Sequence, residues 1–248
     1  MVDHGERHVA HVVRSLLDSG QYTNATIECN GKIFPVHKAI ICSQSAYFSN
    51  AFNSSHGFRE AVSSTIHLGV TKACVVDSMV TYMYTGRYPH YAPYDTTELL
   101  HCVDVYAIAE MYQVQGLKEF ATAHFKDCIV FNLTSTIFPK VVKDIYESTV
   151  DGSRGLRDAV SNAAARSIRD DDTLNNSKFN KALDEVADFR KDVMKRLAKE
   201  QAVTIECPIS TCDFQILIKA AALDSGREEI CPECQYRSTY SYWHQVED

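Results

Sequence analysis

Hydrophobic residues near the start of the chain recur at the spacing of a helix. Between His8 and Leu17 they fall on a single stripe, which consists of Val9, Val12, Val13, Leu16 and Leu17. Asp18, Ser19 and Gly20 follow, and glycine is the usual residue just past a helix end because it adopts left-handed backbone angles. The pattern therefore predicts an amphipathic helix that is capped by Gly20.

The next hundred residues combine short strands with longer helices. Strands are predicted over residues 25–29 and 32–36, and Asn30-Gly31 between them is a strong hairpin signal. Helices are predicted over residues 37–42, 45–53, 72–84, 96–112 and 114–125, and a third strand over residues 64–68. Because strands and helices do not alternate regularly along this segment, the order indicates an α+β fold.

Residues 131–200 have the pattern of packed helices. Helices are predicted over residues 137–147, 156–168 and 179–197. The last of them carries Phe179, Leu183, Val186, Val193 and Leu197 on one face. Its pattern covers fewer than three heptads, so packing on neighbouring helices is favoured over a coiled coil. Asp170-Asp171-Asp172 with Thr173, followed by residues 175–177, predicts a loop between helices.

Four of the nine cysteines lie close together near the end of the chain, beside strands predicted over residues 203–206 and 214–218. They form two pairs, Cys207-x4-Cys212 and Cys231-x2-Cys234, and 18 residues separate the pairs. Two short-spaced pairs can supply the four soft ligands of a structural zinc ion, and a module this small gains from a metal staple. The spacing predicts a four-cysteine, zinc-ribbon-like module with no open coordination position. Four ordinary thiols and a redox pair at Cys231 and Cys234 are the alternatives, and His244 is a substitute ligand.

The other five cysteines are scattered. Cys29, Cys42, Cys74, Cys102 and Cys128 are expected to be small buried hydrophobic residues. An odd cysteine count and a start without an apolar signal region predict reduced thiols and a cytoplasmic or nuclear location.

No apolar run approaches the length of about 18 residues that a membrane span needs.

Charge argues against a nucleic-acid partner. The formal net charge is -7, and residues 201–248 hold three basic residues against eight acidic ones. An acidic surface cannot release the counterions of a phosphate backbone, which is the main source of affinity for nucleic acids. Hydrophobic residues make up 45% and charged residues 23%, as in ordinary globular proteins.

Several separated stretches resemble the BTB/POZ domain family. They are Ala25-Thr26-Ile27, Phe34-Pro35-Val36-His37-Lys38, Ser45-x-Tyr47-Phe48, residues 82–88 (YMYTGRY), and residues 105–112 (VYAIAEMY) followed by Leu117. The resemblance implies a BTB/POZ fold, a short-stranded sheet flanked by helices, over residues 20–130. Residues 1–19 would then be a dimer-type helix, residues 131–200 a helical extension and residues 201–248 the zinc-stapled β module. This layout is similar to a group of BTB proteins of filamentous fungi.

The resemblance also implies a non-catalytic protein–protein interaction adaptor. BTB domains pair with their own copies, so the stripe of Val9, Val12, Val13, Leu16 and Leu17 is expected at a homodimer interface. Phe58 and Glu60 look like the hydrophobic-x-Glu element with which some BTB adaptors contact a cullin scaffold of a ubiquitin ligase. A BTB-dimerising transcriptional or chromatin-associated regulator is the alternative. Asn24 counts against it, since many BTB domains have an Asp there that helps form a corepressor groove.

Catalytic motifs are missing from the sequence. There is no phosphate-binding glycine loop, no G-x-S-x-G and no H-E-x-x-H, so neither an enzyme nor an organic cofactor is expected. His37 begins a predicted helix, where its ring can bond to backbone, and a structural role is expected for it. Gly86 in Tyr84-Thr85-Gly86 is expected to end a helix through its conformational freedom.

Overall fold

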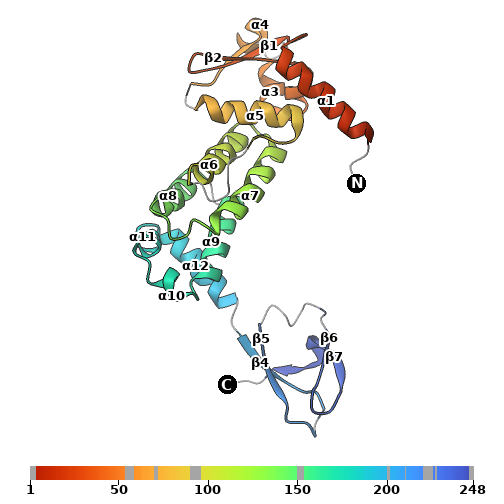
Figure 1. Ribbon diagram of the computed structural model, residues 1–248, viewed down its shortest axis with the longest axis vertical. Coiled ribbons are helices and arrows are strands. Elements are labelled where there is room, and N and C mark those ends of the chain that lie inside the picture. Colours follow the sequence, from red (N-terminus) through yellow and green to blue (C-terminus); the bar gives the residue numbers. More distant parts are fainter. Residues whose placement is uncertain are drawn as a thin grey trace.

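The computed structural model describes residues 4–53, 59–69, 72–89, 96–149, 154–199, 202–209, 211–219, 226 and 228–245. Figure 1 shows a short-stranded sheet and its helices at one end, a helical body in the middle, and a small β module at the other end. Among the described residues, no helix combines the length and the apolar character that a membrane crossing demands.

The first part of the chain forms a helix and a three-stranded sheet. Helix α1 spans His4–Ser19, and the sheet consists of β1 (Ala25–Cys29), β2 (Lys32–Val36) and β3 (Thr65–His67). Strands β1 and β2 are antiparallel, whereas β3 runs parallel to β1 on its other side. Asn30 and Gly31 both have positive φ angles in the turn between β1 and β2, as a tight hairpin of this type requires.

Helices complete this part and carry most of its core. They are α2 (Lys38–Cys42), α3 (Ala46–Ala51), α4 (Arg59–Ser63), α5 (Ala73–Thr85), α6 (Thr96–Met111) and α7 (Gln115–Ile129). Helix α5 ends as predicted at Gly86, which has a φ angle of 70° and donates its N–H to the Tyr82 carbonyl at 2.7 Å. Helices α6 and α7 pack along each other as a hairpin, and Figure 1 shows them leading into the helical body.

Residues 138–199 form five further helices. These are α8 (Phe138–Ser148), α9 (Gly155–Ser167), α10 (Asp171–Leu174), α11 (Ser177–Glu185) and α12 (Ala187–Lys199). Helix α9 packs on α7, and α8 packs on α6. Buried residues from Ala25 to Val193 belong to one continuous hydrophobic core. The helical extension is therefore a rigid continuation of the first part rather than a separate globule.

Charged side chains fix three helices of the extension to one another. Asp192 on α12 accepts hydrogen bonds from Tyr146 on α8 and from Arg154 at the start of α9, each at 2.9 Å. Burial raises the pKa of Asp192, but these two hydrogen bonds outweigh it and hold the pKa below its usual value. Arg196 on α12 also contacts Asp158 on α9 at 2.7 Å. These bonds set the register in which α12 lies against α9.

The β module has its own small core. Strands β4 (Ala202–Glu206), β5 (Gln215–Lys219) and β8 (His244–Gln245) form one sheet, and β6 (Glu228–Ile230) pairs with β7 (Arg237–Thr239). The 3-10 helix η3 (Tyr240–Tyr242) precedes β8. The core residues are Ile205, Cys207, Ile218, Cys231, Tyr240 and Trp243. This core is separate from the one that joins the first part to the extension.

The structure corrects several sequence-based expectations. The helix predicted over residues 179–197 is two helices, because Val186 takes extended angles (φ −118°, ψ 90°) between α11 and α12. The acidic run predicted as a loop is helix α10, which Asp170 caps by accepting a hydrogen bond from the Thr173 backbone. Residues 59–63, for which the sequence predicted no regular structure, form helix α4, and this helix includes Glu60.

One cysteine also departs from the expected pattern. Cys29, Cys102 and Cys128 are buried and Cys42 is half-buried, but Cys74 is exposed. Cys74 lies in the first turn of α5, where the next two residues face the core and leave the Cys74 side chain on the outer side. It is therefore not the small core residue that was expected.

Candidate metal centre and interaction surfaces

The four clustered cysteines meet at one point of the β module. Cys207 and Cys212 lie in the turn between β4 and β5, and Cys231 and Cys234 lie in the turn between β6 and β7. The sulfur atoms of Cys207 and Cys234 are 3.5 Å apart, and those of Cys212 and Cys231 are 3.6 Å apart. All four sulfurs lie within 4.8 Å of one another. Two hairpin turns far apart in the sequence thus bring four thiols together.

This arrangement fits a tetrahedral metal ion. Four sulfurs at the usual zinc–sulfur distance of about 2.3 Å stand about 3.8 Å from each other. The observed sulfur–sulfur distances lie close to that value, so only small movements would complete the tetrahedron. With four thiols converging, the site offers no position for a substrate or water, and its chemistry would be structural.

Backbone hydrogen bonds shape the turns and tune the sulfurs. The Cys207 N–H donates to the Phe214 carbonyl, and the Cys231 N–H donates to the Tyr236 carbonyl, each at 2.9 Å. Burial raises the pKa of the Cys231 thiol, but hydrogen bonds from the backbone of Cys234 and Glu233 outweigh burial and lower the pKa to about 7. A backbone hydrogen bond from Phe214 lowers the pKa of Cys212, but burial and the neighbouring thiols outweigh it and raise the pKa to about 12, so Cys231 is the sulfur of this pair that ionises first.

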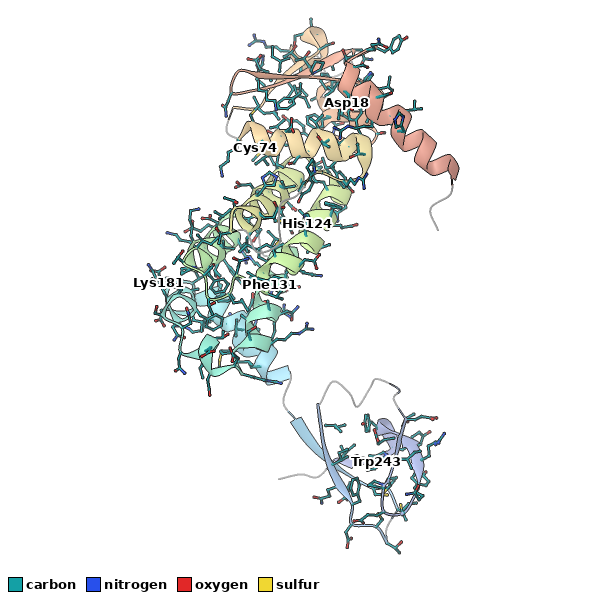
Figure 2. All side chains as sticks on the ribbon, viewed as in Figure 1. Asp18, Cys74, His124, Phe131, Lys181 and Trp243 are labelled. Carbon is teal, nitrogen blue, oxygen red and sulfur yellow. The ribbon has the colours of Figure 1, made fainter. Side chains whose placement is uncertain are left out.

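Aromatic residues of the module divide between core and surface. Trp243 is 4% exposed and meets Phe214 edge-on, with ring centroids 6.4 Å apart, and Tyr240 is buried too. Tyr236 and Tyr242 are exposed. Figure 2 labels Trp243 among the side chains of the module. Tyr240 and Trp243 thus belong to the core of the module, and Tyr236 and Tyr242 belong to its surface. The side chain of His244 lies outside the described part of the module.

A second candidate surface lies where α4 meets the edge strand β3. A groove there is lined by Arg59, Glu60, Val62, Ser63, Thr65 and His67. Glu60 is half-buried in the first turn of α4, while Val62 is 86% exposed. Phe58, the other residue of the cullin-like motif, lies outside the described residues.

The stripe on α1 divides between two environments. Val13 and Leu17 pack on the core of their own chain, Leu16 is half-buried, and Val12 is 44% exposed. The Val9 side chain lies outside the described part of the helix. Figure 1 shows the first turns of α1 reaching beyond the rest of the domain. The helix therefore covers its own domain with one edge of the stripe and leaves Val12 accessible.

His37 and Asn24 have structural roles. The Nε2 atom of His37 lies 2.7 Å from the Gln21 carbonyl, so it carries the proton, and Nδ1 accepts from the Tyr84 hydroxyl at 2.7 Å. The His37 ring bonds to backbone, as the sequence predicted. The Asn24 side-chain oxygen accepts the Lys38 N–H at 2.8 Å and so caps the start of α2. A neutral amide can perform this capping without the charge of an Asp.

Comparison with known proteins identifies the first part of the chain. Residues 13–129 match the family model of the BTB/POZ domain. The chain therefore contains a BTB/POZ domain, as its sequence motifs predicted. The match begins inside α1 and ends at the last residue of α7, so it leaves the helical extension and the β module unassigned.

Curated relatives share the same stretch. Kelch-like protein 24a of Danio rerio is 32% identical over 79 residues, which are 32% of this chain and 13% of that protein. Kelch repeat and BTB domain-containing protein 4 of Homo sapiens is 25% identical over 116 residues, which are 47% of this chain and 20% of that protein. The chain thus spans only about a fifth or less of the length of these relatives.

Two solved structures are similar at low identity. The BTB domain of zebrafish PATZ1 is 15% identical, with a TM-score of 0.39, and the alignment covers 51% of this chain and 97% of that chain. The BTB domain of human Gigaxonin is 19% identical, with a TM-score of 0.37, over 50% of this chain and 95% of that chain.

Proposed function

We propose that this protein is a non-catalytic interaction adaptor whose BTB domain binds a cullin-type scaffold of a ubiquitin ligase. The observation that carries this proposal is the groove between α4 and β3, where Glu60 stands beside the exposed Val62 in a domain of an interaction family. Glu60 is the acidic residue of the cullin-like motif, and Val62 adds an accessible apolar side chain to the same groove.

The continuous core supports a mechanical role for the helical extension. Helices α8 and α9 pack on α6 and α7, so a partner held by the extension keeps a fixed orientation relative to the BTB domain. An adaptor must hold two proteins at a defined separation, and a shared core does this better than a flexible linker. Residues 131–199 thus act as a rigid arm in this proposal.

The β module would hold a structural zinc ion through Cys207, Cys212, Cys231 and Cys234. The spacing of the four sulfurs and the closed donor set support this assignment. The ion would stabilise a module too small to rely on its six core residues, and the exposed Tyr236 and Tyr242 would be available to a second protein.

Pairing of two copies through α1 completes the proposed assembly. Val12 and the reach of α1 beyond its own domain support a homodimer in which the stripe of one helix meets the partner copy. Light scattering of the purified chain beside a Val12→Asp variant tests this. The variant is expected to shift toward the mass of a monomer, and an unchanged mass would mean that α1 only covers its own domain.

The decisive experiment measures binding of the full chain to the N-terminal region of a BTB-recruiting cullin. We expect saturable binding at micromolar concentration or tighter, about −8 kcal/mol. The Phe58→Ala/Glu60→Ala variant should weaken it at least about tenfold, since removal of an interface anchor typically costs about 2 kcal/mol or more.

A matched control is available in the β module, far from the α4–β3 groove in Figure 1. Tyr242→Ala/Glu228→Ala removes an exposed aromatic residue and an exposed acid, just as the test variant removes an aromatic residue and an acid. It should bind the cullin like the unmodified chain. Absence of binding by the folded, unmodified chain would refute the cullin proposal and leave a self-associating scaffold for another partner.

A further inference from the structure

A second group of metal-ligand side chains lies inside the BTB domain, at the interface of α6 and α7. Glu98 and Cys102 stand four residues apart on α6, and His124 and Cys128 stand four residues apart on α7. Residues at this spacing share a helix face. Since the helices pack along each other, the two pairs face each other across the interface. Figure 2 marks His124 on α7.

The donor atoms lie at distances suited to a shared ion. Glu98 Oε1 is 3.8 Å from His124 Nδ1 and 3.9 Å from the Cys102 sulfur, and ligand atoms of these three residues all lie within 4.8 Å of one another. Cys128 lies near Cys102, but its sulfur is not among the ligand atoms that all lie within 4.8 Å of one another, so it would move further than the other three to bind. Ligand atoms around a tetrahedral zinc ion stand about 3.3–3.8 Å apart, so a small contraction would bring Glu98, Cys102 and His124 to that spacing.

The surroundings are dry and aromatic. Glu98 is 1% exposed, Cys102 and Cys128 are buried, and the His124 side chain is 15% exposed. Tyr88 packs edge-on against His124, with ring centroids 5.8 Å apart, and Phe120 also contacts this imidazole. The buried hydroxyl of Tyr88 lies close to Cys102, yet no hydrogen bond of good geometry reaches it from the described residues.

We propose that Glu98, Cys102, His124 and Cys128 form a second metal site, for a borderline-soft divalent cation such as Zn²⁺, between α6 and α7. Two sulfurs, one imidazole nitrogen and one carboxylate oxygen are ligands that zinc accepts in a single site. His124, at the rim, gives the ion a route from solvent.

Such an ion would brace the hairpin where the chain leaves the BTB domain. Cys128 lies in the last turn of α7, and its carbonyl accepts a hydrogen bond from the Asn132 side chain at 2.9 Å. The metal would thus fix the end of α7, from which the helical extension starts. This inference is independent of cullin binding and of the metal site in the β module.

The test uses the full chain with the β-module ligands removed, Cys231→Ser/Cys234→Ser, as the reference protein. We expect this protein to bind one Co²⁺ per chain, with sulfur-to-cobalt charge-transfer absorption and the visible bands of a tetrahedral site with mixed ligands. Zn²⁺ should displace the Co²⁺ and raise the melting temperature of the helices. Metal analysis after dialysis should find one zinc ion in the reference and two in the unmodified chain.

Further variants of the reference protein assign the ligands. Cys102→Ser should reduce the charge-transfer band by about half, because Cys128 remains as a sulfur ligand, and Glu98→Gln and His124→Gln should each weaken Co²⁺ binding at least about tenfold. Cys29→Ser removes another buried thiol of the same domain and should bind Co²⁺ unchanged. If Cys102→Ser does not fold, the Co²⁺ affinity of His124→Gln tests the site instead. The His124 side chain is the most accessible of the four, so its substitution should disturb the core least.

Two results would overturn the inference. One is a reference protein with native helical circular dichroism that takes up no Co²⁺ through sulfur. The other is Co²⁺ binding that persists unchanged in folded His124→Gln and Glu98→Gln variants. Either result would make the four side chains a polar cluster of the core without a metal.

Discussion

Substitution of Cys231 by serine should unfold the β module and leave the helices intact. Cys231 is fully buried and supplies one of the four converging sulfurs. Binding of a structural zinc ion provides about 10–16 kcal/mol at neutral pH. The four other buried core residues of the module contribute about 6–12 kcal/mol through burial, at about 1.5–3 kcal/mol each. Loss of the metal therefore removes at least as much stabilisation as burial of these four residues supplies over most of the two ranges.

The chain contains its own reporter for this event. Trp243 is the sole tryptophan among the 248 residues, and it lies buried in the module core. Its fluorescence should shift to longer wavelength in Cys231→Ser, while the helical circular dichroism from residues 4–199 stays close to that of the unmodified chain. Zinc content should fall by one ion per chain. The Trp243 emission and the helical circular dichroism should change independently, because the core of the β module is not continuous with the core of the helices.

Cys74→Ser is the control, because it removes an exposed thiol far from the module in the sequence. It should keep both the Trp243 emission and the zinc content. A Cys231→Ser protein with unshifted Trp243 emission and unchanged zinc content would refute the assignment. Loss of the helical signal together with the emission shift would refute the independence of the two cores.

Three further predictions concern the helical body. Asp192→Asn should lower the free energy of unfolding by about 1–2 kcal/mol at neutral pH. Because the folded pKa of Asp192 is depressed, this contribution is present above pH about 4 and is lost as the pH falls through the folded pKa, so urea unfolding at about pH 3 should give a smaller difference. Gly155→Val should cost about 1–3 kcal/mol, since even a Cβ atom there would lie 3.0 Å from the Tyr106 hydroxyl, and a melting temperature equal to that of the unmodified chain would contradict this close packing. Tyr84→Phe should cost about 1–3 kcal/mol in denaturant unfolding, because it leaves the buried N–H of His37 without its acceptor, and an unchanged midpoint would show that the hydroxyl is dispensable.

The sequence pattern was sufficient to predict those turns and helix ends that depend only on residues adjacent in the chain. The hairpin at Asn30-Gly31 and the helix end at Gly86 follow from backbone angles that few residues adopt, so their positions were predictable. The sequence motifs also identified the BTB/POZ domain. In contrast, the sequence did not predict the helix break at Val186, because the apolar periodicity continues across this residue. The two helices are separate because α11 packs on α8 whereas α12 packs on α9.

The sequence by itself determined which residues could serve as ligands in the β module, because short Cys spacings place two sulfurs at one turn. The spacings also predicted that the two pairs share one site, but tertiary structure decided which sulfurs lie nearest, Cys207 to Cys234 and Cys212 to Cys231. Only tertiary structure brings Glu98 and Cys102 near His124 and Cys128. Each pair shows the four-residue spacing in the sequence, yet Cys102 and Cys128 were predicted only as small core residues. Their convergence depends on how α6 lies against α7, and that packing is set by the whole core.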